Sequence, residues 1–126
     1  MKVPIQYALT YPNHLEAQWE NLDLSAIQEL TFESPDYDKF PSMTYAFQSL
    51  ESGGTMPAVF NVANESAVYA FLDGLIGFHH IPTLVESAMS EHQVVDNPEL
   101  SDIIETEKWT KTYIQHKLDE DFVNRK

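Results

Sequence analysis

The chain has 126 residues, of which 43% are hydrophobic, including seven Phe, six Tyr and two Trp. This length and composition suit one compact domain with a substantial core and argue against disorder. Twenty acidic and seven basic residues give a formal net charge of -13, which repels nucleic acid and anionic membrane surfaces. The sequence contains no cysteine, which excludes disulfides, thiolate metal sites and cysteine nucleophiles.

The first segment, "MKVPIQYALTYPNH", carries one lysine, an early proline and no long apolar run. We therefore expect neither a signal peptide nor a membrane span, and with the absence of cysteine this indicates a cytoplasmic protein. A short helix is predicted from Pro4 to Tyr11, because the apolar residues between them share one face and Pro12 would end the helix.

The segment of residues 13–35 has weak periodicity and is predicted to be an irregular or extended connection. Within it, "SAIQ" resembles a capping box, with Ser25 as the N-cap and Gln28 reaching back to it. The stretch "LTFE" alternates like a short strand, which would place Leu30 and Phe32 on one side.

Prolines and glycines then mark out three helices. The first starts at Pro41 and ends at "SGG". Its apolar stripe is Met43, Ala46, Phe47 and Leu50. The second runs from Pro57 to Asp73 and is apolar over most of its circumference, which predicts a central position. The third starts at Pro82 and fades near "SEH". Its apolar stripe is Leu84, Val85, Ala88 and Met89.

A fourth helix is predicted to begin at Pro98, with Asn97 as its N-cap and Glu99 at the positive end of the helix dipole. One face of this helix carries the apolar residues Leu100, Ile103, Ile104, Ile114, Leu118 and Phe122. The helix is therefore expected to extend as far as residue 122.

Four residues in the middle of this helix complicate its packing. Glu107 and Lys111, spaced i, i+4, interrupt the apolar face. Trp109 and Tyr113 point the opposite way. Either the helix bends between two packing surfaces, or one surface meets another chain or domain.

The sequence contains no glycine-rich phosphate loop, no nucleophile elbow and no zinc helix motif. The adjacent His79 and His80 are expected to point in different directions from a polar loop, which is poor geometry for a metal. His116 and Glu120, at i and i+4, could pair or hold a metal, but a metal needs three or four convergent ligands. The neighbouring carboxylates expected to be solvated are Asp36, Asp38, Asp119 and Asp121. No catalytic, cofactor-binding or metal-binding residue is predicted.

The stretch "NVANES" places polar side chains on the helix that is expected to be buried nearly all round. Asn61, Asn64 and Glu65 are spaced i, i+3, i+4 and so form one stripe. Because no base or nucleophile is spaced nearby, a structural role is favoured over a catalytic one. Our hypothesis is that the stripe anchors the connecting segment against the helical bundle.

Four blocks of the sequence together resemble the C-terminal part of the 1-deoxy-D-xylulose 5-phosphate reductoisomerase family. These blocks are "MKVPIQYALTYPNH", "LDL", "LTFESPDYDKFP" and "AFQSLESGGTMPAVFNVANESAVYAFLDGLIGFHHIP". Their order and spacing match the family from residue 1 to about residue 91, and the last helix is similar in position. The resemblance implies a mainly α fold: residues 1–35 as the end of the catalytic region and a connecting segment, and residues 36–126 as a bundle of about four helices.

The family enzyme rearranges and reduces 1-deoxy-D-xylulose 5-phosphate to 2-C-methyl-D-erythritol 4-phosphate in the non-mevalonate route to isoprenoids. It uses NADPH and a divalent cation, magnesium or manganese. The resemblance places the NADPH domain, the metal-binding carboxylates and the substrate motif before the point that corresponds to Met1. Met1 itself falls where the family has a methionine near the nicotinamide, or is only a start residue.

Two readings of the function follow from the resemblance. In the favoured one, the chain is a structural C-terminal domain that binds no cofactor, is inactive alone and has the remaining domains of the parent enzyme as its partners. Exposed apolar surface could also drive a homodimer. In the alternative, it is a free-standing helical module of that family that binds a protein partner through the face of Trp109 and Tyr113.

Overall fold

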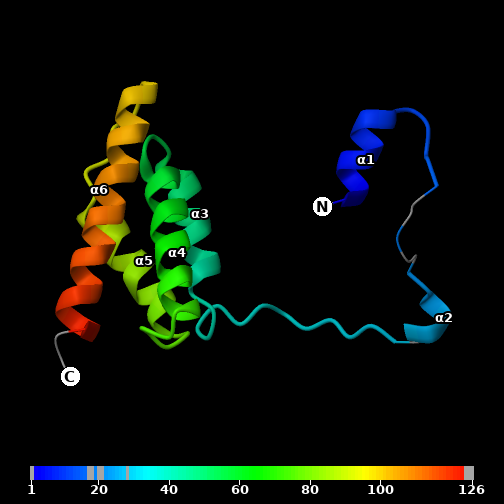
Figure 1. Ribbon diagram of the computed structural model, residues 1–126, viewed down its shortest axis with the longest axis horizontal. Helices are drawn as coiled ribbons and strands as arrows, with labels where there is room; N and C mark the ends of the chain where they lie inside the picture. The colour runs from blue at the N-terminus through cyan, green and yellow to red at the C-terminus, as the bar shows by residue number, and fades with distance from the viewer. Residues whose placement is uncertain (1, 17–18, 20–21, 28, 124–126) are drawn as a thin grey trace. The chain divides into compact units, whose positions relative to one another are not determined.

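The computed structural model describes residues 2–16, 19, 22–27 and 29–123, with side chains up to residue 121. Contacts divide the chain into two compact units, residues 1–34 and residues 35–126. Within the described ranges all regular structure is helical, and α3 to α6 form a bundle in the second unit (Figure 1). This confirms the predicted fold class, a helical bundle preceded by a short helix and an irregular connection. None of the described helices combines the length and apolar composition that a membrane crossing requires.

Among its described residues, the first unit contains two helices, α1 (Lys2–Thr10) and α2 (Leu24–Ile27). Helix α1 corresponds to the helix predicted from Pro4 to Tyr11 and is followed by a cis Tyr11–Pro12 peptide bond. Neither helix contains a buried residue. The apolar side chains of these two helices therefore lie largely exposed to solvent.

Two predictions for the connecting segment are wrong. Asp23, rather than Ser25, caps α2, because its Oδ1 accepts the Ser25 backbone N–H at 2.9 Å and the Ser25 hydroxyl at 2.5 Å. These hydrogen bonds lower the pKa of the Asp23 carboxyl, and the bond from the Ser25 hydroxyl has the largest effect. Gln28 lies outside the described residues. Leu30 and Phe32 are exposed and belong to no strand, because the described part of the chain offers no second strand with which to pair.

Four helices and a π-helical turn make up the second unit as far as residue 123, where its described part ends. They are α3 (Ser42–Ser52), α4 (Met56–Leu72), α5 (His80–Glu91), α6 (Leu100–Leu118) and the π-helical turn η1 (Asp119–Val123). Helix α4 contacts each of the other three helices, which confirms its predicted central position (Figure 1). The three helices predicted from their prolines all form close to the expected starts.

The core of the bundle consists mostly of small and β-branched side chains. Those with no exposed surface are Val59, Ala63 and Ala67 of α4, Val85 and Ala88 of α5, and Ile114 of α6. Alanine at the contact positions lets helix axes approach closely, since the interaxial distance depends on the side chains between them. The larger Leu84 and Leu118 close the core around these positions.

Helix α6 begins two residues later than predicted. Glu99 is its N-cap in place of Asn97, and Leu100 is its first residue in place of Pro98. The reason is a capping box in which the Asp102 carboxylate accepts the Glu99 backbone N–H at 2.8 Å and the Glu99 side chain accepts a backbone N–H in return. This reciprocal pair satisfies two free backbone donors, which a lone Asn97 cap would not do.

Ile114 and Leu118 of α6 are buried as predicted, but the rest of its buried face differs from the predicted one. Its buried residues are Thr106, Thr110, Ile114 and Leu118. Leu100 is 75% exposed and Ile104 is 42% exposed, while the side chain of Phe122 lies outside the described residues. Burial of Thr110 is tolerated because its hydroxyl donates to the Thr106 carbonyl at 2.8 Å. The sequence pattern counts only apolar residues as core residues. It therefore did not place Thr106 and Thr110 on the buried face of α6.

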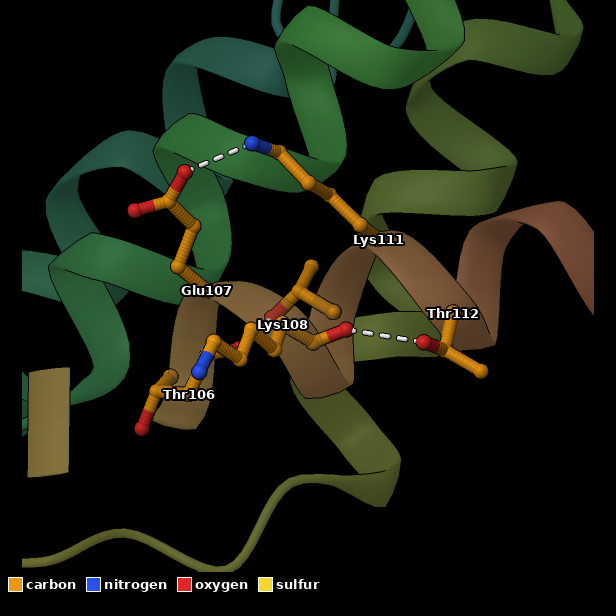
Figure 2. Close-up of polar contacts among 6 residues, drawn as sticks. Thr106, Glu107, Lys108, Lys111 and Thr112 are labelled. Atoms are coloured by element: carbon orange, nitrogen blue, oxygen red, sulfur yellow. Dashed lines mark hydrogen bonds and ion pairs between the residues drawn. The ribbon is translucent and has the colours of Figure 1, made fainter. Parts of the chain in front are cut away.

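Glu107 and Lys111 form the ion pair that their spacing indicates. Figure 2 shows the Lys111 ammonium donating to the Glu107 carboxylate, with 2.6 Å between the two atoms. The Glu107 side chain is 46% exposed and that of Lys111 is 55% exposed. An exposed pair of this kind contributes little to stability, so it marks the edge of the packed face and not a break in the helix.

Trp109 and Tyr113 do not form a free surface. Both side chains pack against the core, and their rings stack with centroids 5.3 Å apart. The Tyr113 hydroxyl hydrogen bonds to Ser87 of α5 at 2.7 Å, and the Trp109 ring lies 5.1 Å from that of His92. The prediction that these residues point away from the packed face is wrong, since they line its border with α5.

A cross-connection of hydrogen bonds, which we call the clasp, ties the start of α4 to the segment after α5. The hydroxyl of the fully buried Thr55 lies 2.7 Å from His92 Nε2 and accepts the Val95 backbone N–H at 3.1 Å. The Thr55 backbone N–H donates to the Val95 carbonyl at 3.2 Å. Gly54, with φ of +52°, brings the chain against Val95 so closely that a Cβ would overlap the Val95 carbonyl oxygen.

Replacing Gly54 with Ala should therefore destabilise the chain strongly, because both the left-handed backbone and the overlap oppose a side chain. Gly53→Ala is the matched control, since Gly53 has a φ of +66° but open space around it. We expect a loss of about 1 kcal/mol for the control and about 3 kcal/mol or more for Gly54→Ala, measured by urea unfolding. Equal losses would show that the close approach to Val95 contributes nothing.

The clasp also predicts a pH dependence of stability. Burial lowers the pKa of His92 below its ordinary 6.5. The unfolded chain therefore binds a proton at this site before the folded chain does, and the free energy of unfolding falls as the pH drops below about 6.5. Urea unfolding between about pH 7 and pH 5.5 should show a shallower fall for His92→Gln than for the unmodified chain. Parallel curves would contradict this role of His92.

Candidate functional site

A hollow of about 900 Å³ opens on the surface of the second unit. Three segments line it: residues 38–45 at the start of α3, Asn64 and Val68 on α4, and residues 78–86 at the start of α5. Most of the lining is apolar, with Phe40, Met43 and Phe78 at its border. Its size and apolar lining match those of sites that receive a ligand or a partner side chain.

A turn at residues 36–40 shapes the wall of this hollow next to α3. The Asp36 carboxylate accepts the Lys39 backbone N–H at 2.9 Å, and the Asp36 carbonyl accepts the Phe40 N–H at 2.9 Å. This is the local bonding that an aspartate at the first position of a turn favours. It places Phe40 and Pro41 directly before α3, where the Pro41 carbonyl accepts the Tyr45 N–H at 3.1 Å.

Two polar groups face each other across the hollow. Tyr45 of α3 lies beside Glu86 of α5. Burial, and after it the neighbouring Glu86 carboxylate, raises the pKa of the Tyr45 phenol above its ordinary value of 10.0. The phenol therefore stays protonated at neutral pH and donates a hydrogen bond to the Glu86 carboxylate.

His79 and His80 lie at the start of α5, and the prediction that they point in different directions is wrong. Their ring centroids are 3.9 Å apart. His80 Nδ1 accepts the Gly77 backbone N–H at 3.1 Å, which turns the ring back toward the preceding loop. The pKa of His80 is lowered, mainly because its ring is partly buried and to a smaller extent because of the neighbouring His79.

The polar stripe on α4 is not buried as predicted. Asn61 and Glu65 are exposed, because α4 is covered on only part of its circumference. Asn64 is half-buried and faces the hollow opposite residues 38–43, but in the described part of the chain no hydrogen bond joins its amide to them. Two of the three stripe residues are therefore exposed in the bundle, and the anchoring of the connecting segment by the stripe stays a prediction. Only Asn64 contributes to the wall of the hollow.

The described residues do not provide a ligand set for a metal ion. No three His, Asp or Glu side chains converge within this part of the chain. His116 and Glu120 form a pair, with 3.2 Å between Nδ1 and Oε2, and both are exposed. Two ligands on one exposed face are too few for the coordination that zinc, magnesium or manganese requires. The part of the chain that the structure describes therefore does not fit a divalent cation.

Comparison with known proteins identifies relatives over nearly the whole chain. The family model described as the DXP reductoisomerase C-terminal domain matches residues 1–113. The 1-deoxy-D-xylulose 5-phosphate reductoisomerase of Pelotomaculum thermopropionicum is 49% identical over 111 residues, covering 88% of this chain and 29% of that protein. The corresponding protein of Acetivibrio thermocellus is 44% identical over 115 residues, covering 91% of this chain and 30% of that protein.

A solved structure agrees with these relatives. The Zymomonas mobilis 1-deoxy-D-xylulose 5-phosphate reductoisomerase, in complex with NADPH, superimposes with a TM-score of 0.81 at 36% identity, covering 94% of this chain and 31% of that one. The chain thus spans about a third of the length of the relatives it matches. The resemblance seen in the sequence is confirmed: the chain belongs to the 1-deoxy-D-xylulose 5-phosphate reductoisomerase family, and its match is to the C-terminal domain of that family.

Proposed function

We propose that the chain is the structural C-terminal part of a 1-deoxy-D-xylulose 5-phosphate reductoisomerase and supports an active site formed by the rest of that enzyme. The observation that carries this proposal is the match of residues 1–113 to the C-terminal domain of the family. The parent enzyme rearranges and reduces 1-deoxy-D-xylulose 5-phosphate to 2-C-methyl-D-erythritol 4-phosphate, with NADPH as the reductant. We place the parent in the cytoplasm, as the lack of cysteine favours.

The two units have different parts in this proposal. The second unit has its own core and acts as a preformed rigid body. The first unit has helices without buried residues, which is typical of a segment whose apolar side chains complete a core elsewhere. We assign residues 1–35 to the end of the catalytic region and the connecting segment, and residues 36–126 to the bundle domain.

The reaction's cofactors belong to the rest of the parent in this proposal. NADPH is bound in the Zymomonas mobilis relative, and the sequence of this chain has no glycine-rich loop to hold its phosphates. The described residues likewise offer no converging set of carboxylates for magnesium or manganese. The contribution of this chain is therefore mechanical, since it positions and stabilises the elements that carry the site.

A domain exchange tests the proposal. The region of the Pelotomaculum thermopropionicum enzyme that matches this chain is replaced with this chain, and NADPH oxidation is measured with 1-deoxy-D-xylulose 5-phosphate and magnesium. The chimera should retain activity within about tenfold of the native enzyme, because the active-site residues are unchanged. The 126-residue chain alone should oxidise no NADPH.

The control is the same enzyme with the matched region deleted, which should be inactive. Activity of the isolated chain would overturn the assignment of a purely structural role. An inactive chimera that binds NADPH normally would show that this chain cannot serve as the C-terminal part of such an enzyme.

A further inference from the structure

The hydroxyl of Thr55 is the central group of the clasp. The residue is fully buried, and its hydroxyl oxygen accepts the Val95 backbone N–H at 3.1 Å. The hydroxyl hydrogen also needs an acceptor, because a buried donor without a partner is destabilising. Among the described residues, the acceptor within reach is His92 Nε2, 2.7 Å away. The Thr55 hydroxyl therefore donates to a neutral His92 ring that carries its hydrogen on Nδ1.

Protonation of the His92 ring would reverse this hydrogen bond. Both nitrogens of an imidazolium are donors, so Nε2 would donate to the Thr55 oxygen. That oxygen would then accept two hydrogen bonds, and its own hydrogen would be left without an acceptor in a fully buried position. Burial also opposes the charge, since it lowers the pKa of His92. The closed clasp therefore favours the neutral ring on two separate grounds.

Residues 93–98, which connect α5 to α6, depend on the clasp for their attachment. In this stretch, all of which the structure describes, Val95 is the one residue whose hydrogen bonds tie it to another described segment, and both of them run to Thr55. Val94 packs against the core but is only partly buried. The buried side chains of α5 and α6 all lie outside this stretch. The segment can therefore separate from the start of α4 while the core stays closed.

We propose that the clasp is a proton-sensitive latch: protonation of His92 opens it and frees residues 93–98 from the start of α4, while the helices remain packed. In the open form His92 has an ordinary pKa of about 6.5, whereas the closed form takes up the proton only at lower pH. The closed clasp is therefore fully stable above about pH 6.5 and loses stability as the pH falls below this value. The latch lies within the bundle and does not depend on the proposed function.

The charged groups around His92 do not cancel this effect. Glu91 of α5 and Glu105 of α6 line a surface hollow together with the His92 and Trp109 rings. Both carboxylates would attract an imidazolium, but both residues are exposed, so water screens the attraction. The start of α4 contributes the uncharged Thr55, and no charge on α3 or α4 has a resolved effect on the pKa of His92. The buried hydroxyl therefore decides which ring form the clasp holds.

Nitrogen-15 NMR of the 126-residue chain at about pH 7.5 tests the proton's position. His92 should carry its hydrogen on Nδ1, with Nε2 unprotonated. A hydrogen on Nε2 at this pH would overturn the inference, because the ring would then already donate to the Thr55 oxygen and protonation would change nothing there.

Backbone amide hydrogen exchange of the same chain tests the opening. Between about pH 7 and pH 5.5, the protection factors of the Thr55 and Val95 amides should fall about fivefold. The amides of Ala63 and Ala88, which lie in the core, should stay about tenfold or more better protected than these two at both pH values.

Two variants serve as matched controls. In His92→Gln the side-chain carbonyl can accept the Thr55 hydroxyl but does not titrate, so the protection factors should be the same at both pH values. His116→Gln replaces an exposed histidine on α6 that pairs with Glu120, and the fall should remain as in the unmodified chain.

Three results in the unmodified chain would contradict the latch. Unchanged protection of Thr55 and Val95 between the two pH values would show that His92 does not control the clasp. Equal protection of Val95 and Ala63 would show that the segment opens only when the whole bundle unfolds. Absence of protection at both Thr55 and Val95 at about pH 7 would show that the clasp does not form.

Discussion

The close packing of α4 against its neighbours is the constraint on which the rest of the bundle depends. Ala63 and Ala67 present almost no side chain at the contact positions and are fully buried. Their small size brings the backbone of α4 near that of α5, where Val85 and Ala88 are equally buried. Enlarging either alanine would push the helices apart. The opposite requirement holds at Ile114 of α6, which has to fill the space that the alanines leave.

Helix α3 differs from the other bundle helices, because its large apolar side chains Phe47 and Leu50 lie on the outside of the bundle. The core is closed by α4, α5 and α6 together with Tyr45 of α3, whereas Phe47 and Leu50 of α3 remain exposed. The clasp of Thr55, His92 and Val95 ties the start of α4 to the segment after α5. The bundle thus presents a stiff apolar surface on α3, next to the chain segment that leads back to the first unit.

Much of this fold could be predicted from the sequence, because prolines and glycines mark the helix ends and apolar residues recur at helical spacing. The central position of α4 follows from its composition. The faces of the helices were less predictable: Thr106 and Thr110 are buried although both are polar, with the Thr110 hydroxyl bonded to the Thr106 carbonyl, and the exposed Phe47 and Leu50 have the spacing of core residues. The hollow combines three segments distant in sequence, and its one signal was the aromatic residues before α3 and α5.

The central claim is that residues 35–126 fold as an independent bundle. Backbone amide hydrogen exchange of the 126-residue chain alone tests this claim most directly. The account predicts that the amides of Ala63, Ala67 and Ala88 exchange only through global unfolding, while those of residues 29–34 exchange rapidly. Rapid exchange along α4 in the isolated chain would contradict it, because the bundle would then need the parent enzyme in order to fold.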